Sequence, residues 1–134
     1  MVGLTIFIDA SAMVSMLGLE DDFEELADRL DEADHRLTSA MAIWETTIAL
    51  SRGRGMMMDS ARADVANFIA ARNIAIVPIG VEEADIALQA HRQFGKGRHP
   101  ARLNMGDCFA YACAKTHDAR LLYKGDDFSK TDLA

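Results

Sequence analysis

Three carboxylates stand in apolar stretches of this sequence, where a charged group is costly to bury without a partner. Asp9 follows the largely apolar run at 5–8, Asp107 precedes the apolar segment 108–114, and Glu45 is the only charge between residues 40 and 50. Asp9 and Asp107 could simply cap helices or turns, because acids suit helix N-termini. Glu45 lies in the middle of its segment and caps nothing, so it is the strongest candidate for a chemical role.

Two adjacent acids near the end of the chain offer a fourth carboxylate. Asp126 and Asp127 stand in the segment KGDDF at 124–128, where either could also be an ordinary turn residue. Four converging carboxylates raise one another's pKa, and a divalent cation removes that cost. Oxygen-only ligands favour Mg²⁺ or Mn²⁺ over Zn²⁺. A hard cation held by carboxylates is a common device for phosphoryl chemistry, which is the chemistry that these acids predict.

The elements that must position these acids alternate between short apolar strands and amphipathic helices. Strands are expected at 5–8, 36–38, 75–78 and 121–123, and helices at 12–17, 20–33, 40–51, 59–72, 81–94 and 106–117. This alternation predicts one α/β domain over residues 1–134, a three-layer α/β/α sandwich around a short, mainly parallel sheet. Ligands bind beyond the carboxyl ends of such strands, where Asp9 and Asp126 follow their strands. The segment 40–50 is apolar nearly all round, which predicts a largely buried helix.

The distribution of charge matters more here than the net charge of −7, which taken alone argues against a nucleic-acid partner. Residues 20–34 hold nine acids and are expected to form the solvated face of a helix, whereas 91–102 hold four cations and no acid. In that basic loop, Lys96, Arg98 and Arg102 are candidate contacts for a phosphate backbone. An ordinary solvated loop would explain them as well.

No stretch approaches the roughly 18 apolar residues that a membrane span needs, and the start of the chain lacks the pattern of a signal peptide. Cys108 and Cys113 lack metal-ligand spacing and are expected to be buried thiols in a reducing compartment. Together these features predict a cytoplasmic protein with no membrane partner.

The segments around the acids match a known family. They read FIDASA at 7–12, WET at 44–46, FGKGRHP at 94–100, LNMGDCFAYA at 103–112 and LLYKGDDFSKTD at 121–132. In these segments the chain resembles the PIN-domain ribonucleases, specifically the VapC-type toxins of bacterial toxin–antitoxin pairs. The resemblance spans essentially the whole chain, and its GDCFAYA and KGDDF segments are the specific parts.

The resemblance implies an endoribonuclease that acts on single-stranded RNA and needs Mg²⁺ or Mn²⁺. By its pattern Asp9, Glu45 and Asp107 bind the metal. The fourth acid is either Asp126 or Asp127: both are carried as catalytic candidates, and Asp126 is carried as the metal ligand. In the expected hydrolysis, metal held by Asp9 and Asp107 orients the scissile phosphate, and a water aligned by Glu45 or by the Asp126–Asp127 pair attacks in line.

The resemblance also concerns neighbouring residues and partners. Ser11 would sit beside Asp9 and close to the RNA, although capping the following helix would explain it equally. A VapB-type antitoxin with a basic or Arg-bearing segment in the acidic groove is implied, as is a homodimer. Two alternatives stay open: a haloacid-dehalogenase-like phosphatase, for which residue 11 lacks the required acid, and a catalytically weak antitoxin-binding module.

Overall fold

A four-stranded parallel sheet forms the centre of the molecule. The computed structural model describes residues 3–97 and 99–133. Its strands are β1 (Thr5–Ile8), β2 (His35–Ser39), β3 (Ala75–Val77) and β4 (Arg120–Leu122), in the order β3-β2-β1-β4. The register pairs Phe7 of β1 with Leu37 of β2 and with Leu121 of β4. The first strand therefore lies inside the sheet, between strands from the middle and the end of the chain.

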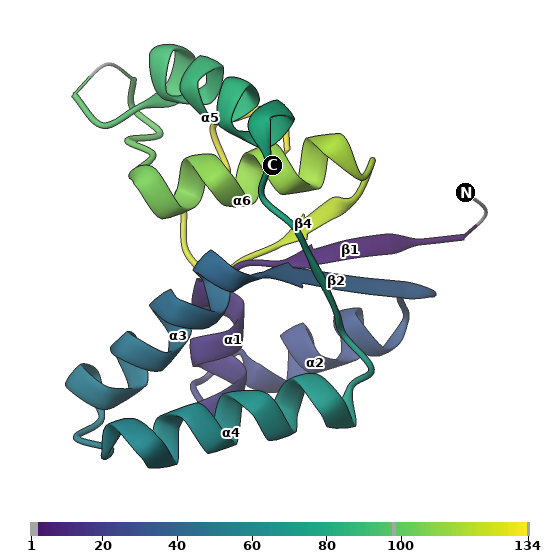
Figure 1. Cartoon of the computed structure of the whole chain (residues 1–134), viewed down its shortest axis with the longest axis vertical. Coiled ribbons are helices and arrows are strands. Elements are labelled where there is room, and N and C mark those ends of the chain that lie inside the picture. Colours follow the sequence, from purple (N-terminus) through teal and green to yellow (C-terminus); the bar gives the residue numbers. More distant parts are fainter. Residues whose placement is uncertain (1–2, 98, 134) are drawn as a thin grey trace.

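Helices cover both faces of this sheet. They are α1 (Ala10–Leu17), α2 (Phe23–Asp31), α3 (Ala40–Gly53), α4 (Met58–Ala71), α5 (Val81–Phe94) and α6 (Met105–Thr116). Figure 1 shows α5 and α6 on one face and α1, α2 and α4 on the other, with α3 beside the end of the sheet where β1 and β2 finish. The predicted α/β/α arrangement is confirmed. Across the described residues, no helix is both long and apolar enough to cross a membrane.

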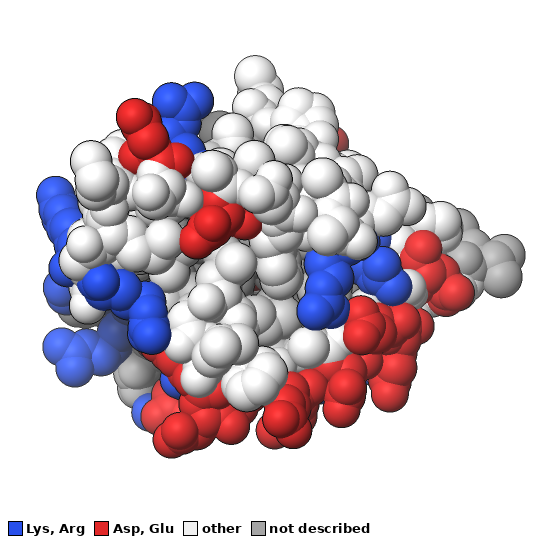
Figure 2. All heavy atoms as spheres, turned by 90° about the horizontal axis from the view of Figure 1, so that it is seen from below, with Lys and Arg blue, Asp and Glu red and all other residues white. Residues whose placement is uncertain are grey.

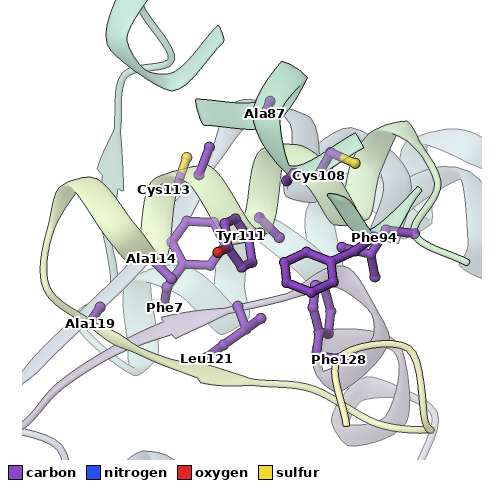
Figure 3. Packing of buried hydrophobic residues seen from close by; sticks show 14 of the residues in the cluster. Phe7, Ala87, Phe94, Cys108, Tyr111, Cys113, Ala114, Ala119, Leu121 and Phe128 are labelled. Carbon is purple, nitrogen blue, oxygen red and sulfur yellow. The ribbon is translucent and has the colours of Figure 1, made fainter. Parts of the chain in front are cut away.

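The central strand β1 is buried on both faces, as its continuous apolar sequence predicts. Phe7 points into the core under α5 and α6, where it joins Phe94, Tyr111 and Phe128 (Figure 3). Ile6 and Ile8 belong to the opposite core under α1 and α2. Burying an aromatic or large aliphatic side chain contributes roughly 1.5–3 kcal/mol each, so these two cores fix the strand that leads into Asp9.

Every helix except α5 differs in its bounds from the sequence-based prediction, and in α1, α2 and α6 side chains at the N-terminus explain where the helix begins. Helix α1 begins at Ala10 because Asp9 caps it. Helix α2 begins at Phe23, since the side chain of Asp22 is taken by Ser15 and that of Glu20 by Lys124. Helix α6 begins at Met105, directly after the capping residue Asn104.

The prediction that the helix over 40–50 is largely buried is wrong. Trp44 of α3 is 64% exposed, and only part of the helix, including Thr46 and Leu50, is buried. The exposed side borders an apolar groove of about 670 Å³ that α4 and Ile76 help to line. The sequence of an apolar helix is the same whether other parts of the protein cover its surface or leave it exposed, so the sequence alone could not show that this side of α3 is open.

The prediction of a solvated acidic helix face is confirmed. Helix α2 buries Leu26 and Leu30, while Glu24, Glu25 and Asp28 are exposed. Figure 2 shows the molecule from below, and acidic side chains gather along the lower border of that view. This charge lies on an outer helix surface, away from the apolar cores.

Candidate acidic active site

An open pocket of about 520 Å³ gathers four of the five candidate acids. Asp9 follows β1, Glu45 lies on α3, Asp107 lies in the first turn of α6, and Asp127 lies in the segment after β4. Asp126 is exposed and does not line the pocket. Of the two adjacent candidates for the fourth acid, Asp127 therefore lies in the pocket with Asp9, Glu45 and Asp107, and Asp126 does not.

Asp9 is held in place by Ser11. The Asp9 Oδ2 atom accepts hydrogen bonds from the backbone N–H of Ser11 at 3.0 Å and from its hydroxyl at 2.6 Å. The Ser11 Oγ atom in turn accepts a hydrogen bond from the backbone N–H of Lys124 at 3.0 Å. Burial raises the pKa of the Asp9 carboxyl, the bonds from Ser11 lower it, and the charge of Asp127 raises it. Asp9 thus caps α1 and faces the pocket at the same time.

Asp107 is fixed in a similar way by Asn104. The backbone N–H of Asn104 donates to Oδ2 of Asp107 at 3.1 Å, and the backbone N–H of Asp107 donates to Oδ1 of Asn104 at 2.9 Å. This reciprocal pair is a capping box at the start of α6. The pKa of Asp107 is raised to about 8, first by burial and then by the charges of Asp9 and Asp127, against the lowering effect of the Asn104 bond.

Glu45 reaches the pocket because α6 has a glycine opposite it. A methyl group built at Gly106 would lie 1.9 Å from Oε2 of Glu45, so the carboxylate rests directly against the backbone of α6. Partial burial, with a further contribution from the charge of Asp9, raises the pKa of Glu45 to about 7. Glu45 and Asp107 are brought together by this close approach of α3 to α6.

Sequence reasoning missed several residues of the pocket wall. Glu20 and Lys124 both line the pocket and form an ion pair, with 2.7 Å between Lys124 Nζ and Glu20 Oε1. No local pattern links residues so far apart in the chain. Asn104 could be only a loop residue by sequence, although its spacing of three from Asp107 is that of a capping box. Gly106 does not line the pocket, and its contact with Glu45 has no signal in the sequence, where it reads as the start of a helix.

The donor chemistry of the pocket fits a hard divalent cation, because its candidate ligands are all carboxylates. Burial is the main cause of the raised pKa values of Asp9, Glu45 and Asp107, and the charge of a neighbouring acid adds to it in each case. A bound cation would offset both costs. In the part of the chain that the structure describes, however, no three His, Cys, Asp or Glu side chains are already arranged as a metal cage. The residues share a pocket without being drawn together around a common point.

The residues predicted to contact RNA differ in how close they lie to the acidic pocket. Ser11 lines the acidic pocket. Lys96 lines a neighbouring apolar pocket that shares Asn104 with the acidic one. Arg102 is exposed and lines neither pocket, and Arg98 lies outside the described residues. Neither of the two basic candidates among the described residues, Lys96 and Arg102, lines the acidic pocket itself.

The comparison with known families supports the fold and the motifs together. A sequence model of the PIN domain matches residues 6–133. The chain belongs to the PIN-domain family.

This PIN-domain protein is similar over most of its length to proteins named VapC ribonucleases. It is 42% identical over 139 residues to a VapC ribonuclease of Rhizobium meliloti (strain 1021), which covers 95% of this chain and 98% of that protein. It is 39% identical over 128 residues to ribonuclease VapC30 of Mycobacterium tuberculosis (strain ATCC 25618 / H37Rv), with 95% of each chain covered. The resemblance to VapC-type proteins seen in the sequence is confirmed.

A solved structure shows the same fold. The crystal structure of Mycobacterium tuberculosis VapC20, a toxin that cleaves the sarcin–ricin loop, matches this PIN-domain structure with a TM-score of 0.68 over 92% of both chains. The two sequences are 22% identical, so this likeness concerns the architecture alone. It agrees with the parallel α/β fold predicted from the sequence.

Proposed function

We propose that this PIN-domain protein is a Mg²⁺-dependent endoribonuclease and the toxin of a toxin–antitoxin pair. The observation that carries the proposal is the pocket in which carboxylates from four separate parts of the chain, Asp9, Glu45, Asp107 and Asp127, lie together. The names of the relatives at 42% and 39% identity support RNA as the substrate. Because its substrate is cellular RNA, we also propose that the protein acts in the cytoplasm.

We assign the metal, Mg²⁺ or Mn²⁺, to the same four carboxylates. When bound, the ion would polarise the scissile phosphate and stabilise the charge that builds up during its hydrolysis. Ser11 and Asn104 hold Asp9 and Asp107 in fixed orientations, so these two ligands do not have to be ordered when the ion or the substrate binds. Asp127 lies in the segment after β4, where it supplies the fourth carboxylate.

Glu45 is the best candidate for a proton acceptor in the reaction. Its carboxylate lies in the pocket with those of Asp9 and Asp107, where it can accept a proton from an attacking water. It also makes no hydrogen bond to another side chain within the described part of the chain, in contrast to Asp9 and Asp107, whose carboxylates are engaged in capping. We infer that Glu45 orients the attacking water and accepts its proton.

We propose that the antitoxin covers the apolar groove beside this pocket as well as the pocket itself. Trp44 and Glu45 are consecutive on α3, yet Trp44 lines the groove and Glu45 lines the pocket. Ile48, Met58 and Ile76 complete an apolar surface next to the carboxylates. A partner segment with apolar side chains and one Arg would fill both and block the acids by a charge-assisted pair. We keep the homodimer as a proposal that a measured mass in solution tests.

The substitution Asp9→Asn tests the proposed activity. Asparagine caps a helix about as well as aspartate, so α1 should remain intact while the charge is lost. We expect cleavage of single-stranded RNA in Mg²⁺ by the wild type, no cleavage in EDTA, and a loss of at least about 100-fold in the variant. Wild-type rates in Asp9→Asn at an unchanged melting temperature would refute the site.

A phosphomonoester assay separates the phosphatase alternative. Hydrolysis of a generic phosphomonoester without any cleavage of RNA would favour that alternative over the ribonuclease. A protein that binds a basic antitoxin peptide but cleaves neither substrate would favour the binding-module alternative.

A further inference from the structure

The wall of the acidic pocket contains a single cation among the described residues that line it, Lys124. The acids around it are Asp9, Glu20, Glu45, Asp107 and Asp127. RNA brings further negative charge to this wall, and affinity for a phosphate backbone comes mainly from Lys and Arg. The one lysine in the wall is therefore the residue best placed to meet a phosphate that enters the pocket.

Lys124 is held at both ends. Its backbone N–H donates to the Ser11 hydroxyl at 3.0 Å, and that hydroxyl donates to Asp9 at 2.6 Å. Its ammonium lies 2.7 Å from Oε1 of Glu20 and 3.5 Å from Oδ1 of Asp22. The backbone of Lys124 is thus linked to Asp9 through one side chain, and its ammonium is held beside Glu20 and Asp22.

The partner of this ammonium is replaceable. The side chains of Lys124 and Glu20 are 38% and 32% exposed, and ion pairs with such access to water contribute little to stability. A phosphate oxygen offers the same charge-assisted hydrogen bond as the Glu20 carboxylate. An RNA phosphate can therefore take the place of Glu20 at Lys124 without a large cost to the fold.

We propose that Lys124 binds a backbone phosphate of the RNA beside the scissile bond, and that Glu20 is the counter-ion which the phosphate displaces. The inference rests on the proposed ribonuclease function and extends it to the binding of the substrate. It makes a distinctive claim: the two halves of one ion pair have opposite effects on RNA affinity.

Binding of a short fluorescein-labelled single-stranded RNA, followed by anisotropy in EDTA so that no cleavage occurs, tests this claim. Lys124→Gln should weaken binding and reduce the slope of log K against log salt by about 0.7, the value for one lost phosphate contact on a single strand. Glu20→Gln should strengthen binding several-fold, because the ammonium then keeps only the longer contact with Asp22, at 3.5 Å. In the Lys124→Gln background the same change of Glu20 should have no effect.

A matched control comes from Lys115, whose side chain has the same 38% exposure and pairs with Asp132 away from the pocket. Lys115→Gln should leave the salt slope unchanged. Melting temperatures of all variants identify any that fail to fold.

Two outcomes would overturn the inference while the proposed ribonuclease stands. One is that Lys124→Gln and Glu20→Gln shift RNA affinity in the same direction or not at all, as a purely structural ion pair would. The other is that Glu20→Gln strengthens binding equally in the Lys124→Gln background, which would point to general charge repulsion. If the wild type neither binds nor cleaves RNA, the proposed function itself is wrong, and the inference falls with it.

Discussion

Replacement of Gly106 by alanine should disable the site without damaging the fold. The added methyl would lie 1.9 Å from Oε2, 2.4 Å from Cδ and 2.5 Å from Oε1 of Glu45. To reach an ordinary contact of 3.4 Å, the carboxylate of Glu45 must move by about 1.5 Å. Because a misplacement of about 1 Å can cost 100-fold in rate, we expect Gly106→Ala to slow RNA cleavage by about 100-fold or more.

The stability of this variant should change in the opposite sense. The atoms that the methyl meets are at the far end of the Glu45 side chain, which can rotate away into the open pocket. Alanine is favoured over glycine in a helix by up to about 1 kcal/mol. The melting temperature should therefore stay level or rise by about 3 °C while activity is lost.

A double-mutant cycle identifies the cause. The initial rate of cleavage of a labelled single-stranded RNA in Mg²⁺ is compared for the wild type, Gly106→Ala, Glu45→Ala and the double variant. If the methyl acts by displacing Glu45, the change Gly106→Ala should not lower the cleavage rate any further in a variant whose Glu45 is already alanine. Wild-type activity in Gly106→Ala, or additive losses in the double variant, would refute the reasoning.

Two further predictions follow from the placement and electrostatics of the acids. Asp127→Asn should reduce cleavage by at least about 100-fold, whereas Asp126→Asn should stay close to the wild type, and equal losses would contradict the placement of Asp127 in the pocket. In EDTA the melting temperature should fall as the pH rises from about 4.5 to about 8, because the folded state keeps protons on Glu45 and Asp107 that the unfolded state releases. For Glu45 this loss is at most about 3 kcal/mol. Added Mg²⁺ should restore stability at pH 8, and a double variant of Glu45→Gln and Asp107→Asn should show a flatter pH profile; stability that rises over this range in EDTA would contradict the assignment.

The sequence predicted the parts of the fold that depend on local patterns. The apolar run of β1 and the helical spacing of α5 identified these elements with the bounds that the structure shows, Thr5–Ile8 and Val81–Phe94. The convergence of Asp9, Glu45 and Asp107 was predictable, because a carboxylate in an apolar segment is costly to bury unless it has a partner. A common site would provide that partner for all three.

The remaining features depend on geometry that sequence patterns do not carry. Asp126 and Asp127 follow Gly125, whose φ of 90° starts a turn in which neighbouring side chains point in directions that no strand or helix period predicts. The contact between Glu20 and Lys124 joins residues 104 positions apart. The exposure of Trp44 depends on what covers α3, and the composition of the helix holds no information about that.

The position of β1 between β2 and β4 has a consequence for how the protein is made. Asp9 leaves the ribosome first among the four acids, whereas the strand that closes the sheet beside it, β4, and the segment that carries Asp127 are synthesised last. A growing chain therefore lacks one carboxylate, the Lys124 bond to Ser11 and the sheet partner that supports Asp9 until β4 and the segment after it have been added. For a protein proposed to cut RNA, the acidic site is therefore incomplete in a chain that still lacks this last segment.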